Sequence, residues 1–272
     1  MLPATSPLQK IQLGARKVLT AFRPPPELPG KLEWAPSANF IVHDERVSTS
    51  VSFAPCTTTR RPGRFFWEFR LYGRNPTEPL WTYRSGPMDL HAQETLESAE
   101  IARAAGLDRL FHYCEVMAYS PDVDPVGVSS VLVSYHHFRS TDGSFDAHLP
   151  AAYIWGAARF TRTEKFHYEN FPGVRSDADS RLTVITLNPF VRPMKYWIEL
   201  VDAQGTRHEE GPFRIAGKGV SRWEGDKVPA TLRNPLGLVV RSESKAASFV
   251  GAVDVPTGRM TDLEHMHPFF SR

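Results

Sequence analysis

The stretch from residue 181 to residue 270 constrains the fold most, because short apolar runs in it alternate with polar residues. Tyr196, Ile198 and Leu200 alternate with polar residues such as Lys195 and Glu199, which is the two-residue period of a half-buried β-strand. Pairs such as Asn-Pro, Gln-Gly and Gly-Pro separate the runs, and these pairs favour turns. Five or six short strands without intervening helices predict an antiparallel sandwich or barrel.

The same order of segments occurs earlier in the chain. The run 67–71 corresponds to 196–200, and the Gly-Pro pair at 86–87 corresponds to the pair at 211–212. These are two of six matches that occur in the same order, and six are unlikely to arise by chance. The sequence therefore predicts a tandem duplication with its boundary at 149–153.

Length and composition agree with two domains. A chain of 272 residues exceeds what one core usually organises, and two domains of roughly 100 to 130 residues fit it. We expect an all-β protein of two tandem antiparallel β-sandwich domains, at 31–150 and 151–272, after an N-terminal segment at 1–30. The net charge of +2 gives no general electrostatic reason to bind nucleic acid. No apolar run approaches the roughly 20 residues that span a bilayer.

Residues 1–30 predict a short, basic, amphipathic helix followed by a proline-rich linker. Its apolar residues recur at spacings of three and four, namely Leu8, Ile11, Ala15, Val18, Leu19 and Phe22. Such a helix could dock on an anionic membrane surface or a partner, act as a targeting segment, or pack over a sandwich edge. Charges interrupt every candidate core of a secretory signal, so we expect a cytoplasmic protein.

Both cysteines, Cys56 and Cys114, lie in the first half. With Trp67 between them, they repeat the order cysteine, tryptophan, cysteine of an immunoglobulin domain. However, His112 replaces the expected tyrosine and the second half has no cysteine, so we expect two reduced thiols. Between them, the stretch 94–111 predicts a short helix that stops at Gly106.

Each half ends in a group of histidines and acids. Histidines two apart on a strand point to the same side, so His265 and His267 could share a metal ion, as could Asp146 and His148. A nearby acid could fix the imidazole tautomer. The candidate ligands of a divalent transition metal are therefore His148, Glu264, His265 and His267. The alternative is that these are solvated strand-end residues, because a cysteine or three-histidine zinc set is missing.

Adjacent histidines on a strand point to opposite faces, so at most one of His136 and His137 joins any such site.

Other catalytic motifs are absent from the sequence, which contains no Gly-x-Ser-x-Gly elbow, no phosphate-binding loop and no GxGxxG. An enzymatic function would therefore depend on the histidines alone.

Tryptophans provide a second kind of candidate site. Trp81 and Trp223 lie near predicted turns, where an exposed indole could stack on a sugar ring. Trp67 and Trp197 alternate with charged neighbours, and we expect these two in cores or interfaces. The sequence thus nominates Trp81 and Trp223 as ligand-binding residues, with a carbohydrate as one class of ligand.

The second half resembles the small cytosolic β-sandwich family of sensory rhodopsin transducers. The resemblance covers residues 152–254, and it is carried by YIWGAARF, LTVITLNPF, IELVDAQGT, GPFRIAGKGV and LGLVVRSESKAASFVGAVDV. The first half resembles the family more faintly, through the internal repeat. The resemblance implies oligomeric sandwiches that bind partners or small ligands without catalysing a reaction. Here, two sandwiches in one chain would take the place of an association between subunits.

These observations favour a non-enzymatic adaptor or interaction module that binds a protein or small-molecule ligand, with the groove between the halves as the binding place. Peripheral membrane contact through the N-terminal helix and homo-oligomer formation remain open. Two alternatives are a structural subunit of a larger assembly and a metal-dependent enzyme. The enzyme would use His136 or His137 with His148, or Glu264 with His265 and His267.

Overall fold

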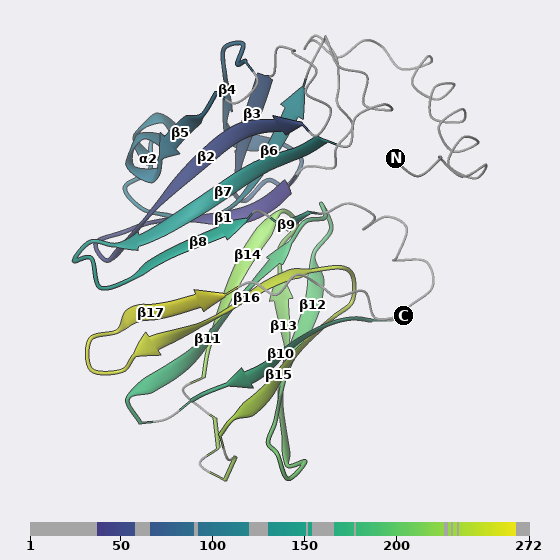
Figure 1. Ribbon diagram of the computed structural model, residues 1–272. Coiled ribbons are helices and arrows are strands. Elements are labelled where there is room, and N and C mark those ends of the chain that lie inside the picture. The colour runs from purple at the N-terminus through teal and green to yellow at the C-terminus, as the bar shows by residue number, and fades with distance from the viewer. Residues whose placement is uncertain are drawn as a thin grey trace, which may run out of the picture.

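The computed structural model describes residues 37–57, 66–89, 92–119, 130–150, 152–153, 166–176, 178–225, 228–229, 231–232 and 234–264. Antiparallel strands, together with one short helix, make up most of this part of the chain (Figure 1), which confirms the predicted all-β class. The predicted helix in 1–30 lies outside the described residues. Within the described ranges, no helix is long and apolar enough to cross a bilayer.

The first half is one nine-stranded sheet in the order β4-β3-β6-β1-β2-β7-β8, with β5 on β2 and β9 on β1. Its elements are β1 (Ser37–His43), β2 (Val47–Thr57), β3 (Phe66–Tyr72), β4 (Pro79–Arg84), β5 (Glu94–Glu97), α2 (Ser98–Ala105), β6 (Leu110–Tyr119), β7 (Ser130–Ser140), β8 (Asp146–Pro150) and β9 (Ala152–Tyr153). The strands β1 and β2 pair only at the hairpin between them, through His43 and Ser48. The sheet therefore divides there into two leaves, β4-β3-β6-β1 and β5-β2-β7-β8.

The second half is two separate four-stranded sheets, β10-β15-β12-β13 and β14-β11-β16-β17. Its strands are β10 (His167–Val174), β11 (Ser180–Asn188), β12 (Met194–Val201), β13 (Arg207–Ile215), β14 (Gly219–Glu224), β15 (Leu236–Ser242), β16 (Ala247–Asp254) and β17 (Arg259–Glu264). A buried cluster fills the space between the two sheets, and it includes Tyr196, Ile198 and Leu200 as the alternating pattern predicts. This half is a β-sandwich.

Strand pairing is the same in the two halves. The leaf β4-β3-β6-β1 has the order of the sheet β13-β12-β15-β10, and β5-β2-β7-β8 has the order of β14-β11-β16-β17. Each of the strands β1 to β8 thus corresponds to the strand whose number is nine higher, from β10 to β17. A duplication of one eight-stranded unit would produce this correspondence.

The helix α2 forms where the sequence predicts it. Gly106 ends it in the left-handed region at φ 70°, which a residue without a side chain adopts at little cost. Ile101 and Ala102 are buried against the strands of both leaves. In the second half, the corresponding connection instead places Val228 and Leu232 against the core.

Cys114 lies within the core of the first half. It is a free and buried thiol, which agrees with the expectation for this cysteine, whereas the Cys56 side chain lies outside the described part of the structure. Burial raises the pKa of Cys114 well above the ordinary value. The thiol of Cys114 is therefore protonated and unreactive at neutral pH.

A third buried cluster joins the two halves. Neighbouring residues of β1, β3 and β6 divide between two clusters: Ile41, Leu71 and Cys114 face the first core, whereas Phe40, Tyr72 and Tyr113 face the second half. There they meet Ile185 and Leu187 of β11 and Phe249 of β16. The rings of Phe40 and Phe249 are 5.1 Å apart in an edge-to-face arrangement.

This junction joins unlike surfaces of the two halves. The first half contributes the β4-β3-β6-β1 leaf together with Phe138, Phe145 and Leu149 from β7, β8 and the turn between them. The second half contributes the β14-β11-β16-β17 sheet, which corresponds to the other leaf of the first half (Figure 1). Such a contact is heterologous, unlike the self-complementary contact of a two-fold dimer. Because apolar side chains from both halves are buried in it, the halves form one packed body.

A buried ion pair lies at one end of this junction. Lys218 Nζ contacts Glu115 Oε1, and the Tyr72 and Tyr113 hydroxyls donate to the same carboxylate at 2.9 and 2.8 Å. The ammonium group also lies 5.6 Å from both tyrosine ring centroids. Burial, with Glu115 nearby, raises the pKa of Tyr72 to about 12, so its hydroxyl remains a donor. The carboxylate is thus neutralised by a cation from the other half.

We expect Lys218→Met to lower the free energy of unfolding by about 3 to 5 kcal/mol, measured by urea denaturation. The substitution leaves Glu115 buried without its cation, and breaking a buried pair from one side costs about that much. Arg109→Met is the matched control, because it breaks an ion pair with Glu45 that is exposed on both sides and is worth at most about 1 kcal/mol. Equal effects of the two substitutions would contradict the structural importance of the buried pair.

Candidate functional site

A groove of about 470 Å³ lies where the two halves meet, beside their shared core. Its walls come from the β1–β2 turn and the start of β6 in one half, and from β11, β14, β16 and β17 in the other. The apolar side chains of the lining are Phe40, Val42, Val47, Phe111, Phe138, Ile185, Val253 and Met260. The volume is in the range of sites that enclose small molecules, about 300 to 1,000 Å³.

The rim of the groove carries four arginines, Arg46, Arg109, Arg181 and Arg222, and three acids, Asp44, Glu45 and Glu224. Four positive and three negative groups leave a formal charge of +1. Two of the arginines, Arg181 and Arg222, share the Glu224 carboxylate, at 3.4 and 2.8 Å. The groove therefore combines an apolar lining with an excess of cationic hydrogen-bond donors.

Arg46 closes one end of the groove across the junction. Its guanidinium Nη1 donates to the carbonyl oxygen of Gly258 at 3.0 Å, which is a neutral acceptor. Gly258 has φ 66°, and a Cβ atom there would lie 2.7 Å from Arg46 Nη1. A side chain at this position would therefore displace the guanidinium. The Asp44 carboxylate holds the turn by accepting the backbone N–H groups of Arg46 and Val47.

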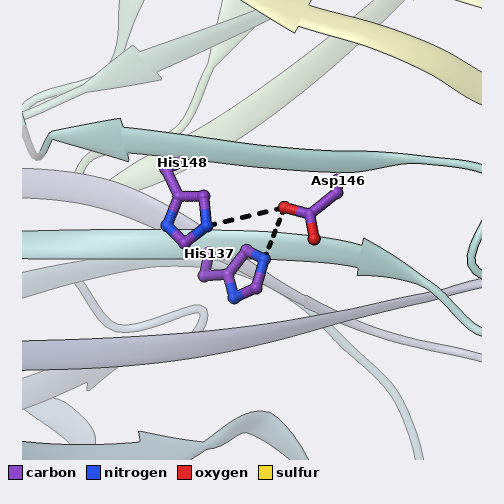
Figure 2. A group of neighbouring side chains, drawn as sticks. All are labelled: His137, Asp146 and His148. Atoms are coloured by element: carbon purple, nitrogen blue, oxygen red, sulfur yellow. Dashed lines mark hydrogen bonds and ion pairs between the residues drawn. The ribbon is translucent and has the colours of Figure 1, made fainter.

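A second candidate site lies on the outer face of β7 and β8 (Figure 2). His137 and His148 are direct cross-strand partners, and their rings stack with centroids 3.8 Å apart and planes 13° apart. The Oδ1 atom of Asp146 lies 2.6 Å from His137 Nε2 and 3.5 Å from His148 Nε2. One ligand atom from each of the three residues lies within 4.8 Å of the other two. We call this set the histidine cluster.

His136 points to the opposite face, as expected for neighbours on a strand. It is fully buried and stacks against Phe138. Burial lowers the pKa of its imidazole to about 3, so the ring is neutral. His136 therefore belongs to the core of the first half.

The structure brings together only part of the predicted metal set. His148 joins the cluster, whereas Glu264 is an exposed residue at the end of β17 and belongs to no such cluster among the described residues. His265 and His267 lie outside the described residues. The sequence left open whether His136 or His137 joins His148, because the register that places His137 opposite His148 is set by pairing between strands.

The two predicted stacking residues are less open than expected. Trp223 is only 5% exposed, lies in the core of the second half and donates from Nε1 to Glu210 at 2.9 Å. The expectation of an exposed indole is wrong there, because the side chain points between the two sheets. Trp81 is half-buried on the core of the first half, beside Phe69 and Tyr83. Ligand binding by Trp81 stays a prediction.

Neither the protein-family models nor the curated proteins compared with this chain include a match to it. Its function therefore has to be argued from the groove and the histidine cluster.

Glu169, away from both surfaces, is a buried carboxyl group on β10. Its Oε1 accepts the Ser248 backbone N–H at 3.2 Å, while no hydrogen-bond partner reaches Oε2 from the described residues. Burial raises the pKa of Glu169 from 4.5 to about 7, against the opposing effect of Lys245. Between these two pH values the folded protein binds more protons than the unfolded chain, so stability falls as pH rises.

We expect Glu169→Gln to remove that part of the pH dependence. The free energy of unfolding of Glu169→Gln minus that of the wild type should rise by roughly 1 to 3 kcal/mol between pH 5 and pH 7.5. This difference should not rise further above pH 8. Denaturant unfolding at several pH values measures this difference. Glu264→Gln, at an exposed position, is the control. A constant difference between Glu169→Gln and wild type would contradict a titrating Glu169.

Proposed function

We propose that this chain is a non-enzymatic binding protein built from two tandem β-sandwiches, and that the groove between them takes a small amphiphilic anion. The groove carries the proposal, because it combines an apolar lining with an arginine-rich rim. A ligand with a carboxylate or sulfonate head and a hydrocarbon or aromatic body would match both features. A cytoplasmic adaptor role for the protein is part of the same proposal.

The duplication belongs to this proposal. It is supported by the equal strand order of the two halves and by the matching segments of the sequence. Residues 152–254 also resemble sensory rhodopsin transducers, whose sandwiches bind partners or ligands without catalysis. In a tandem protein, the contact between sandwiches is permanent, so a site formed at their junction does not depend on protein concentration.

The chemistry of the rim favours an anion over a neutral ligand. Glu224 accepts from both Arg181 and Arg222, and Arg46 donates to a carbonyl group. An incoming carboxylate could therefore accept from Arg46 and Arg222 without leaving Glu224 unpaired. Arginine donates to carboxylates in two parallel hydrogen bonds, which gives both direction and affinity. The exposed ring of Phe111 and the half-buried side chain of Val42 would contact the apolar body of the ligand.

Titration calorimetry with decanoate, decanol and decylamine tests this function. We expect decanoate to bind with one site per chain and the other two to bind at least about tenfold more weakly, because a hydrogen bond to a charged group contributes about 1.5 to 3 kcal/mol. Arg46→Gln and Arg222→Gln should each weaken decanoate binding by a similar factor.

Arg103→Gln is the matched control, because it removes an exposed arginine from the last turn of α2, outside the groove. Its affinity for decanoate should equal that of the wild type. Equal binding of decanoate and decanol, or an equal loss in all three arginine variants, would contradict an anion site in the groove.

A further inference from the structure

We propose that His137, Asp146 and His148 bind one divalent transition metal ion of the zinc class on the outer face of β7 and β8. This site is independent of the groove, whose lining contains none of the three residues. It combines Asp146 and His148, which the sequence already paired as possible ligands, with His137. Glu264, His265 and His267 of the expected set are not part of it. The ligands come from one hairpin of the first half.

The backbone of the hairpin already places the three ligands. His137 and His148 are paired across β7 and β8, and Asp146 precedes His148 by two residues on the same strand face. Side chains paired in this way have Cβ atoms about 4.5 to 5.5 Å apart. Figure 2 shows a nitrogen of each imidazole directed at the same Asp146 carboxylate oxygen. Binding would therefore need no change in strand pairing.

The distances between donor atoms are close to those that a metal ion requires. Zinc lies about 2.0 to 2.1 Å from imidazole nitrogen and 2.0 to 2.2 Å from carboxylate oxygen, so two donors of a tetrahedral ion are about 3.4 Å apart. His148 Nε2 and Asp146 Oδ1 are 3.5 Å apart, and His137 Nε2 and Asp146 Oδ1 are 2.6 Å apart. The shorter contact must open by somewhat less than 1 Å. The Asp146 side chain is 59% exposed and has room to rotate.

The donor set selects the class of metal. Two imidazole nitrogens and one carboxylate oxygen suit zinc and its neighbours among the first-row transition metals, whereas calcium and magnesium prefer oxygen ligands alone. Three protein ligands leave one tetrahedral position for water. His137 and His148 line a depression of about 420 Å³ together with Gln93 and Tyr135, so that position is accessible from solvent.

Zinc titration of full-length protein without an affinity tag tests the site, by calorimetry and by the visible absorption of bound cobalt. We expect one ion per chain and no competition from excess calcium. His137→Gln, His148→Gln and Asp146→Asn should each lower zinc affinity at least about tenfold, which is the lower bound seen when even the partners of metal ligands are removed.

His208→Gln is the matched control. His208 also lies on a strand and contacts an acid, Glu210, at 3.1 Å, but it belongs to no three-residue cluster among the described residues. Its zinc affinity should equal that of the wild type. Circular dichroism would establish that every variant is folded.

Three results would overturn the site. The first is the absence of saturable zinc binding. The second is an equal zinc affinity of His148→Gln and wild type. The third is a stoichiometric zinc site that is kept in His137→Gln but lost in the double variant with His265→Gln and His267→Gln. The last result would place the ion at the end of the second half. In the His148→Gln variant, decanoate binding should be unchanged, so the metal site and the groove can fail separately.

Discussion

The contact between the β4-β3-β6-β1 leaf and the β14-β11-β16-β17 sheet holds the two halves together, and both ends of this contact have chemical consequences. At its centre, Phe40 packs edge-to-face on Phe249 within a cluster buried on both sides. At one end, the cation of Lys218 neutralises Glu115. At the other end the two surfaces separate, and their separation forms the groove. Changes in the buried contact would therefore alter the groove as well as the stability.

Because the contact is heterologous, sheets with the same strand order have different surfaces. In the second half, β16 directs Phe249 and Val253 toward the junction and the groove. In the first half, the corresponding strand β7 directs Tyr135, His137 and Arg139 toward solvent. Burial favours apolar side chains on the first surface, whereas the second can carry polar groups without a desolvation cost. The histidine cluster lies on the face that the junction leaves open.

Local pattern predicted the elements, whereas contacts between distant strands decided the sites. The period of the run 196–200 identifies a half-buried strand, and Gly106 ends the helix, because both features depend on neighbours in the chain. By contrast, the pairing of His137 with His148 depends on strand register, and the burial of Trp223 depends on which sheet covers it. Neither can be derived from spacing along one strand. The groove was expected from a two-domain chain, but its arginine rim comes from segments that only the folded junction brings together.

Methyl NMR of the protein labelled at isoleucine and methionine would test most directly whether the junction is the binding part of the molecule. On addition of decanoate, we expect saturable shifts for Ile185 and Met260, which line the groove. Ile198 and Met194, in the separate core of the second half, should not shift. Shifts confined to Ile198 and Met194, or no saturable shift at Ile185 and Met260, would contradict binding in the groove at the junction.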